Sequence, residues 1–245
     1  MNTEIQIAPD STLAHQSWRR RVGLAAKRVL DLLLAVVLLL VLAPTGLLCA
    51  LLIRADSVGP VFFRQDRLGL YGRIFRIWKF RTMVVNAQQL EREGGHHKDD
   101  PIVTRLGAVL RKFHLDEFPQ LLNVVRGEMS LVGPRPLLPQ YLDGYSEEDK
   151  RRLLMPPGMT GWQQVVGSSD NSWEERVALD VWYVDHWSPW LDLWILVRTA
   201  YEVPFRSDKA YARDGRQDCG IPTKYRTPSP PNSSEGDAVG ESLCH

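Results

Sequence analysis

The longest run of apolar residues in the chain covers positions 29–53, where Asp31 is the only charged residue. A run of this length is long enough to cross a bilayer, which takes about 20 residues. Pro44, followed by Thr45 and Gly46, interrupts the run, because proline inside a helix removes a hydrogen bond and clashes with the preceding turn. The part before Pro44 would extend only about 22 Å as a helix, less than a hydrocarbon core of roughly 30 Å. The pattern therefore predicts a membrane segment of two helices with a break at Pro44.

Lysine and arginine dominate both flanks of this run. Positions 15–28 carry five of them and no acid, and positions 54–81 carry seven against Asp56 and Asp66. Because basic residues favour the cytoplasmic side of a membrane, a helix that crosses once would put one flank on the wrong side. A helix that enters, bends at Pro44 and returns keeps both flanks on the same side. We therefore favour a re-entrant membrane hairpin at 29–53, with a single crossing as the alternative.

After this segment the pattern alternates between short β-like and longer helical stretches. Apolar and basic residues alternate at 59–69 and 71–83 around a glycine-containing turn, which predicts two short strands. In the last helical stretch, Trp194 and Tyr201 would either anchor the helix at a membrane interface or pack in the core. The helices are expected near 104–113, 117–125, 146–154, 171–187 and 190–203.

These elements predict an α/β protein that is mostly helical with a small β element. With 245 residues the chain is long enough for one domain with a hydrophobic core. We expect a basic N-terminal arm at 1–28, the membrane hairpin at 29–53, a single folded domain at 54–206 and a tail at 207–245. The tail is rich in proline, serine and glycine and is predicted to be disordered, because it can bury little apolar surface.

Composition narrows the range of partners. The formal net charge is +1, so no global positive field attracts the chain to nucleic acid, and we expect no nucleic-acid partner. The cysteines Cys49, Cys219 and Cys244 have no metal-binding spacing and form no disulfide framework, which fits a reducing compartment.

Two adjacent carboxylates, Asp116 and Glu117, stand in the sequence HLDEFPQLLN at 114–123. One interpretation is structural: Asp116 caps a helix that begins near Glu117 and has Pro119 in its first turn. The other is functional, because the free N–H groups at a helix N-terminus suit phosphate and keep an aspartate ionised. The two interpretations are compatible, since a cap geometry would let both carboxylates converge on one metal ion or phosphate.

Five cationic side chains accompany the carboxylate pair. Lys79 and Arg81 alternate along a predicted strand and share one of its faces, and Arg105 and Arg111 lie on the predicted helix before the pair. Arg135 stands between two prolines, which fix its backbone and reduce the entropy lost when its guanidinium binds a phosphate. Together they predict a site for a highly charged phosphorylated substrate at a membrane surface. An attacking carboxylate would need these cations and a divalent metal ion to approach such a phosphate.

Four motifs follow one another along the chain: KFRTM at 79–83, LDEFPQLLNVVRGEMSLVGPRP at 115–136, PGMTGW at 157–162 and LDVWYV at 179–184. In these motifs, and from about position 27 to 204, the chain resembles the bacterial sugar transferase family. These are small monotopic polyprenyl-phosphate phosphoglycosyl transferases that begin polysaccharide or glycoprotein glycan assembly. The segment PRPLLPQYL is most similar to members that handle acetylated amino sugars.

The resemblance implies that Asp116 attacks the sugar-bearing phosphate of a UDP-sugar, that UMP leaves, and that the phosphosugar on Asp116 passes to polyprenyl (undecaprenyl) phosphate. It implies Mg²⁺ at Asp116 and Glu117, or Glu117 as the group that handles a proton. It also implies that Gln164 and Asp180 bind substrate together with the five cations. The domain at 54–206 would be catalytic and lie on the cytoplasmic face of the inner membrane, with interfacial amphipathic helices touching lipid. A homodimer is compatible with this family.

One segment departs from the family. Relatives commonly carry Asn-Gly-Arg-Asn where this chain has Val166, Gly167, Ser168 and Ser169, so the donor could differ or another residue could replace the arginine. Two other functions remain as alternatives. A membrane-anchored glycosyltransferase would release UDP instead of UMP, and a non-catalytic membrane scaffold for glycan enzymes would tolerate loss of the carboxylate pair.

Overall fold

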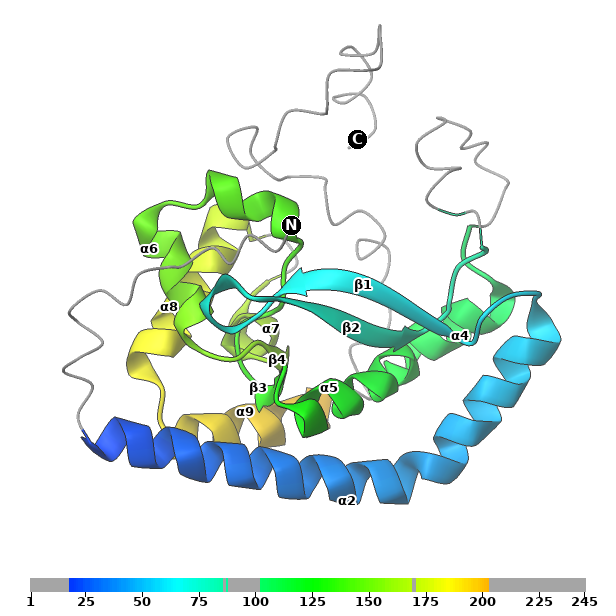
Figure 1. The fold of residues 1–245 in the computed structure, drawn as a ribbon, viewed down its shortest axis with the longest axis horizontal. Coiled ribbons are helices and arrows are strands. Elements are labelled where there is room, and N and C mark those ends of the chain that lie inside the picture. Colours follow the sequence, from blue (N-terminus) through cyan, green and yellow to red (C-terminus); the bar gives the residue numbers. More distant parts are fainter. Residues whose placement is uncertain (1–17, 86, 88–101, 169–170, 203–245) are drawn as a thin grey trace, which may run out of the picture.

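The computed structural model describes residues 18–85, 87, 102–168 and 171–202, so most of the predicted arm and the predicted tail lie outside the described residues. Its first element is one long helix, α2 (Trp18–Asp56), which continues through Pro44 and bends along its length (Figure 1). Proline cannot donate the hydrogen bond to the carbonyl four residues earlier, so a kink inside the helix is the expected result. The predicted pair of separate helices is therefore a single bent helix.

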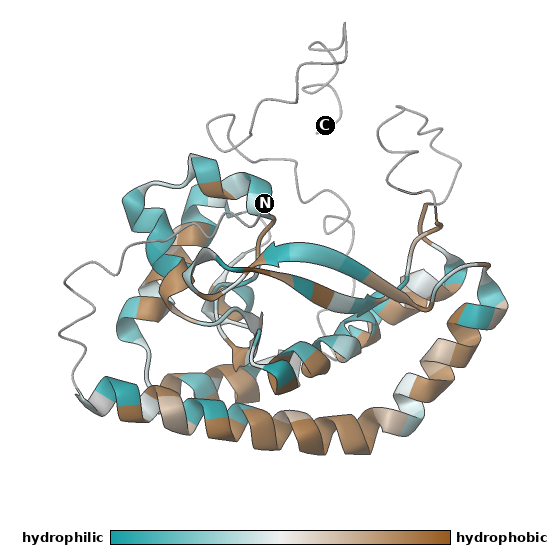
Figure 2. Cartoon of the chain, viewed as in Figure 1, coloured by the Kyte–Doolittle hydropathy of each residue, from teal (hydrophilic) through white to brown (hydrophobic). Residues whose placement is uncertain are grey.

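Most apolar side chains of α2 face away from the rest of the protein. The helix segment Arg20–Asp56 contains a window with a mean hydropathy of 2.8, and only 11% of that window is buried. A core helix of a soluble protein would instead be covered by neighbouring elements. Figure 2 shows the apolar middle of α2 between more polar ends. This helix is long and apolar enough to cross a membrane, which indicates a membrane-associated protein.

An antiparallel hairpin follows α2. Strand β1 (Phe62–Leu68) pairs with β2 (Ile74–Phe80), and the short 3-10 helix η1 (Leu70–Gly72) connects them. The register runs from Phe62 opposite Phe80 to Leu68 opposite Ile74. The hairpin confirms the two strands that the alternation of apolar and basic residues predicted.

The rest of the described chain is mostly helical. Helices were expected near 104–113, 146–154, 171–187 and 190–203, and all are present, with Ser146 and Ser172 in capping boxes at two of their starts. A pair of short parallel strands was not expected, and it joins segments that are far apart in the sequence. The elements are α4 (Arg105–Lys112), η2 (Leu115–Gln120), α5 (Leu121–Arg126), β3 (Ser130–Val132), η3 (Pro139–Gly144), α6 (Glu147–Lys150), η4 (Arg151–Leu154), β4 (Gly158–Thr160), α7 (Trp162–Val166), α8 (Trp173–His186) and α9 (Pro189–Glu202).

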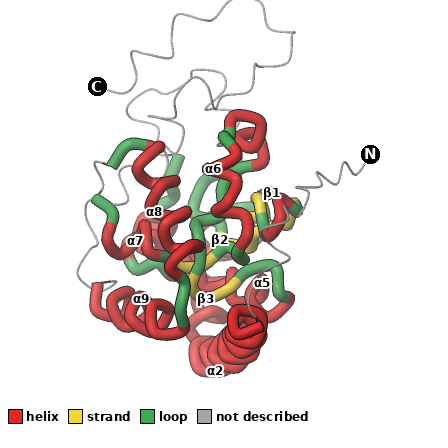
Figure 3. Tube along the Cα trace, turned by 90° about the vertical axis from the view of Figure 1, so that its left-hand side faces the viewer, coloured by secondary structure: helices red, strands yellow, loops and turns green. Residues whose placement is uncertain are grey.

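The largest hydrophobic core lies between α2 and the elements above it. Helix α9 runs beside α2 at the base of the molecule in Figures 1 and 3. A buried polar cluster joins the two helices: Lys27 lies 2.7 Å from Asp192 and 3.8 Å from Asp31, and Tyr183 donates to Asp192 at 2.7 Å. The core residues are Ala35, Phe75, Ile77, Leu121, Val124, Met129, Leu131, Val132, Met155, Val165, Tyr183, Val184 and Ile195.

Candidate active site

Asp116 and Glu117 lie in η2, the 3-10 helix between α4 and α5. The residue before this helix is His114, whose φ of 54° and ψ of 18° lie in the left-handed region that few non-glycine residues adopt. His114 is therefore the N-cap, and the interpretation of Asp116 as a helix cap is wrong, since Asp116 lies inside the first turn. Backbone conformations of this kind are concentrated at functional sites, where the surrounding structure holds them.

The carboxylate pair faces the hairpin. Asp116 is buried, with 5% of its surface exposed, and Glu117 is partly buried. Lys79 of β2 donates from Nζ to Oε1 of Glu117 at 2.8 Å, and less than a fifth of either side chain is exposed. Water screens such a pair less than it screens an ion pair on the open surface. The structure thus brings Lys79 into contact with Glu117, the neighbour of Asp116 in η2.

Asn123 fixes the position of β2 beside the pair. It is fully buried, its Oδ1 accepts from the backbone N–H of Trp78 at 3.0 Å, and its Nδ2 donates to the carbonyl of Arg76 at 2.8 Å. These bonds pair the outer edge of β2 with α5 in the way that a neighbouring strand would. Because Lys79 follows directly on Trp78, a side chain of α5 sets the direction in which Lys79 reaches the carboxylates.

Helix α2 contacts the segment that carries the carboxylates at two points. Phe118, next to the pair, packs on Gly46, where an added Cβ atom would lie 2.5 Å from Cε1 of the ring. The same ring stacks on Phe80, with 6.3 Å between centroids. At the other end of the segment, Arg28 donates to two carbonyls in the last turn of α5 at 2.5 and 2.9 Å. The carboxylate pair is therefore attached to the apolar helix just beyond the proline.

Two of the other predicted cations lie on α4. Arg111 donates from Nε to Oγ1 of Thr82 at 2.9 Å, which places it beside the strand end that carries Lys79. Arg105 is exposed in the first turn of the same helix. Both arginines thus lie on the helix that precedes the carboxylate pair: Arg111 is bonded next to the end of β2, and Arg105 is exposed at the surface.

Arg81 binds backbone groups at the end of α2. It is buried, and its guanidinium donates to the backbone carbonyls of Ser57 and Val58 at 2.8 and 2.9 Å, directly after the end of α2. A Cβ atom added to Gly59 would lie 1.9 Å from Nη1 of Arg81, so the loop at Gly59 packs closely against the Arg81 side chain. Arg81 thus ties the end of α2 to β2, and its expected contact with substrate stays a prediction.

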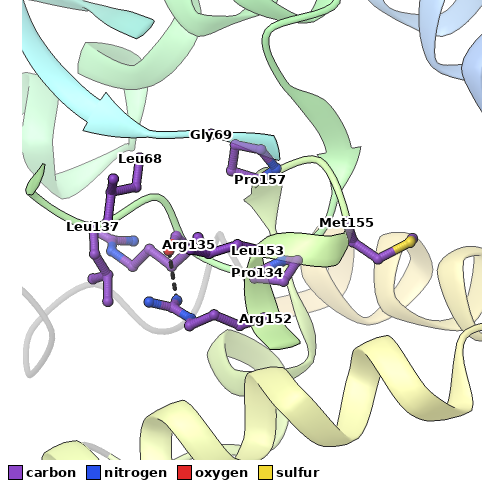
Figure 4. Close-up of a pocket in the computed structure, with 9 residues that line it drawn as sticks. All are labelled: Leu68, Gly69, Pro134, Arg135, Leu137, Arg152, Leu153, Met155 and Pro157. Carbon is purple, nitrogen blue, oxygen red and sulfur yellow. Dashed lines mark hydrogen bonds between the residues drawn. The ribbon is translucent and has the colours of Figure 1, made fainter. Parts of the chain in front are cut away.

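Arg135 lies in the loop after β3, against the far end of the hairpin. Leu68, which lies beside Arg135, pairs with Ile74, about 16 Å along β2 from Lys79 at roughly 3.3 Å per residue. The Arg135 loop and the carboxylate pair therefore occupy the two ends of the hairpin. Figure 4 shows Arg135 among the other residues that line a small pocket: Leu68, Gly69, Pro134, Leu137, Arg152, Leu153, Met155 and Pro157.

Gln164 and Asp180 were expected to bind substrate. Gln164 lies on α7, and its Nε2 donates to the carbonyl of Met159 at 3.4 Å. Asp180 of α8 is almost fully buried and forms an ion pair with the equally buried Arg152. Burial raises the pKa of Asp180, and the guanidinium of Arg152 opposes this shift. Asp180 is therefore part of the support beneath the Arg135 loop, and its expected contact with substrate stays a prediction.

The carboxylate pair also decides which metal ion could fit. Asp116 and Glu117 offer carboxylate oxygens, which are the ligands that Mg²⁺ prefers. Among the described residues, no group of three or more His, Cys, Asp or Glu side chains could hold a metal ion. Mg²⁺ is often bound through one or two carboxylates, with water and substrate phosphates as the other ligands. The pair therefore fits an Mg²⁺ ion that binds together with a phosphorylated substrate.

Four residues that shape the site escaped the sequence pattern: Arg28, Gly46, Asn123 and Arg152. Asn123 carried a signal, because it is the polar residue of the apolar stretch LLNVV and a buried amide needs hydrogen-bond partners. Arg152 carried none, because it stands in the charge-rich stretch SEEDKRRLL, which is typical of an exposed helix.

Comparison with known proteins adds an independent result. A family model described as bacterial sugar transferase matches residues 22–206. The chain is 45% identical over 177 residues to the uncharacterized sugar transferase EpsL of Bacillus subtilis (strain 168), which covers 72% of this chain and 86% of EpsL. It is 42% identical over 194 residues to the exopolysaccharide production protein ExoY of Rhizobium meliloti (strain 1021), which covers 74% of this chain and 86% of ExoY.

A longer relative shares the same region. The chain is 45% identical over 184 residues to the undecaprenyl-phosphate glucose phosphotransferase of Komagataeibacter xylinus. That match covers 71% of this chain and 35% of the relative. This chain thus spans most of EpsL and ExoY but only about a third of the glucose phosphotransferase.

Proposed function

Because this chain belongs to the bacterial sugar transferase family, we propose that it transfers a sugar phosphate from a UDP-sugar to a polyprenyl phosphate such as undecaprenyl phosphate. The names of the relatives support the acceptor and the setting: one is an undecaprenyl-phosphate glucose phosphotransferase and another an exopolysaccharide production protein. The reaction would be the first membrane step of polysaccharide or glycoprotein glycan assembly. The observation that carries the proposal is the buried Asp116 beside the Lys79–Glu117 ion pair, attached to the apolar helix α2 through Phe118.

The transfer takes place in two steps at one phosphorus atom. An oxygen of Asp116 attacks the phosphorus that carries the sugar, the bond from this phosphorus to UMP breaks, and UMP leaves. The phosphosugar then remains on Asp116 as an acyl phosphate. In the second step an oxygen of polyprenyl phosphate attacks the same phosphorus, and the bond to Asp116 breaks. The products are the polyprenyl-diphosphate sugar and a restored carboxylate, and no further reactant is consumed.

The surroundings of Asp116 suit this chemistry. A carboxylate and a diphosphate repel each other, so the attack needs positive charge at the site. Lys79 lies at hydrogen-bond distance from Glu117, and Arg111 lies at the same end of the strand. Mg²⁺ held by the carboxylate pair and the substrate phosphates would neutralise further charge. The burial of Asp116 keeps away water that would hydrolyse the intermediate.

The size of the donor explains why cations lie at both ends of the hairpin. A nucleotide sugar bound with its reacting phosphorus at Asp116 would extend its other groups along the hairpin. The partly buried Arg135 stands toward the opposite end, where its guanidinium N–H groups could donate to the uridine end of the donor.

The acceptor lipid requires a site at a membrane surface. Both ends of α2 contact the same folded domain: Arg20 donates to the carbonyl of Val184 at 2.9 Å, and Arg81 holds the loop after Asp56. A helix attached in this way supports the re-entrant arrangement, with the catalytic domain on the cytoplasmic face of the inner membrane. Trp190 and Tyr201 of α9 are exposed beside α2 and would lie at the lipid interface.

The released nucleotide tests the proposal. Purified protein is incubated with Mg²⁺, undecaprenyl phosphate and a panel of UDP-sugars, and the nucleotide products are separated by chromatography. We expect UMP with at least one sugar, and a loss of at least a thousandfold in Asp116→Asn, because an amide oxygen is a poor nucleophile. Mass spectrometry of protein incubated with the UDP-sugar in the absence of acceptor should find the phosphosugar on Asp116.

The other outcomes separate the alternative functions. UDP as the released nucleotide would indicate a glycosyltransferase that transfers sugar alone. An absence of turnover with every UDP-sugar, in protein that is folded and bound to membranes, would favour a scaffold. Normal turnover by Asp116→Asn would rule out the aspartyl intermediate.

A further inference from the structure

The loop that carries Arg135 is held to its neighbours by backbone contacts. A Cβ atom on Gly133 would lie 2.3 Å from the carbonyl oxygen of Pro156, and one on Gly158 would lie 2.1 Å from the backbone nitrogen of Gly133. The segment after β3 and the start of β4 are therefore in direct backbone contact. Within residues 131–136 only Arg135 is not buried, so its side chain is the part of this loop that reaches the surface. Three backbone hydrogen bonds of 2.8–2.9 Å hold the loop: Gly133 donates to Thr160, Gly158 to Pro134, and Leu68 to Leu137.

The buried ion pair of Arg152 and Asp180 holds the main chain of Arg135 from both sides. Arg152 donates from Nη2 to the carbonyl of Arg135 at 2.8 Å (Figure 4) and to Oδ2 of Asp180. The backbone N–H of Arg135 donates to the carboxylate of Asp180. Tyr145 completes the arrangement, because its hydroxyl accepts from Nη1 of Arg152 at 2.8 Å. One ion pair thus binds both polar main-chain groups of a single residue.

Stability alone is a weak explanation for this ion pair. Two charges lose their hydration when they are buried, so replacing such a pair by apolar residues is often neutral or stabilising. The specific contribution of this pair is directional, because it fixes the main chain at Arg135. Pro134 and Pro136 already restrict the backbone on either side. With its main chain fixed, Arg135 gives up only side-chain freedom when it binds an anion.

We propose that Arg152 and Asp180 are positioning residues that fix the main chain of Arg135 so that its guanidinium binds the nucleotide end of the UDP-sugar, away from the phosphorus at Asp116. The inference rests on the proposed function, because it takes Arg135 as a cation for the donor. It gives Arg152 a role in donor binding without contact with substrate. It also explains why the aspartate of the LDVWYV motif is buried.

A double-mutant cycle tests this coupling. Arg152→Lys keeps a positive charge beside Asp180. Its single nitrogen cannot take the places of both Nη1, which bonds Tyr145, and Nη2, which bonds Asp180 and the carbonyl of Arg135. We expect it to raise the KM for the UDP-sugar about tenfold, with kcat within threefold. Arg135→Ala should lower kcat/KM for the donor at least tenfold. In the Arg135→Ala background, Arg152→Lys should then change kcat/KM by less than twofold, because it acts only through Arg135.

A matched control is available at the neighbouring position. Arg151 pairs with Glu148 and Asp185 at the surface, so Arg151→Lys should leave all kinetic constants within twofold. If Arg152→Lys does not fold, Tyr145→Phe replaces it, because it removes one hydrogen bond from the same guanidinium. We then expect a threefold or larger rise in KM that disappears in the Arg135→Ala background.

Each outcome decides one question. If Arg152→Lys lowers kcat/KM by the same factor in the Arg135→Ala background as in the unaltered protein, the positioning role is wrong. Normal kinetics of the Arg135→Ala variant would also overturn it. Where Tyr145→Phe replaces Arg152→Lys, an unchanged kcat/KM of that variant would overturn the positioning role as well. If the unaltered protein releases no UMP from any UDP-sugar, the proposed function itself fails. Binding of UDP, measured by calorimetry, then tests the coupling between Arg135 and Arg152 by the same cycle.

Discussion

Two ion pairs that involve the β1–β2 hairpin differ in how far water screens them. Lys79 and Glu117 form an ion pair in which 16% and 18% of the side chains are exposed, whereas Arg76 and Asp66 on the same hairpin are 71% and 56% exposed. Exposed pairs are worth about 0–1 kcal/mol, and attraction between charges grows as the surroundings exclude water. Lys79 should therefore matter for a charged substrate, while Arg76 should not.

Lys79→Met tests the role of this charge. The variant leaves Glu117 without its cation and removes positive charge from the site of the diphosphate. We expect kcat/KM for the UDP-sugar to fall about 10- to 100-fold, which is about 1.4–2.8 kcal/mol of lost transition-state stabilisation. Arg76→Met, on the same strand, should stay within twofold. Equal losses in the two variants, measured by UMP release, would show that the effect comes from net charge and not from the site.

At the scale of secondary structure, helix α2 supports the site directly. Arg28 binds the last turn of α5, and Gly46 receives the ring of Phe118, so both ends of the segment from η2 to α5 rest on the same helix. The bend near Pro44 decides whether both contacts can form together, because the two residues lie on opposite sides of it in the sequence. The shape of α2 is thus part of what places Asp116.

Gly46→Val tests the contact between helix and site. Valine has a better helix propensity than glycine by a few tenths of a kcal/mol, but its side chain would overlap the Phe118 ring, and overpacking costs about 1–3 kcal/mol. The steric term is larger, so we expect the melting temperature to fall by roughly 2–10 °C and UMP release to decrease.

Two further variants make the test specific. Phe118→Leu in the Gly46→Val background should recover most of the melting temperature, because the smaller side chain leaves room for valine. Ala43→Val introduces the same residue at an exposed position of the same helix and should have little effect. A loss in Ala43→Val as large as that in Gly46→Val would point to a general effect on the helix.

At the scale of the whole molecule, apolar and polar surfaces are separated. Helices α2 and α9 lie together at the base, and the polar elements that carry the candidate site lie above them (Figures 1 to 3). Both ends of α2 contact the domain above the base. The proposed re-entrant arrangement keeps both ends on the same side of a bilayer, whereas a single crossing would place them on opposite sides.

Cysteine labelling tests this arrangement. In a background without native cysteines, Val22→Cys and Val58→Cys place one exposed thiol at each end of α2. A membrane-impermeant thiol reagent should label neither variant in intact cells and both variants in permeabilised cells. Labelling of one position in intact cells would establish a single crossing.

Much of the local structure follows from the sequence. The apolar run, the position of the bend, the β1–β2 hairpin and the capped starts of α4, α6 and α8 all depend on residues close together in the chain. Such features are predictable because hydrophobic periodicity and capping act over a few residues. The sequence also singled out the carboxylate pair and Lys79 by residue type, and the structure places Lys79 against Glu117, while their roles in the reaction stay predictions.

Only the tertiary structure decided which polar residues are buried against partners far along the chain. Arg81 and Asp180 matched the expected motifs but are buried against partners far along the chain, while Arg152 looked like a surface charge and is buried as well. The left-handed His114 and the pairing of β3 with β4 were equally hidden. The sequence by itself determined most of the elements and singled out the candidate reactive groups. Burial and long-range partners depend on how the elements pack, and no local pattern records that.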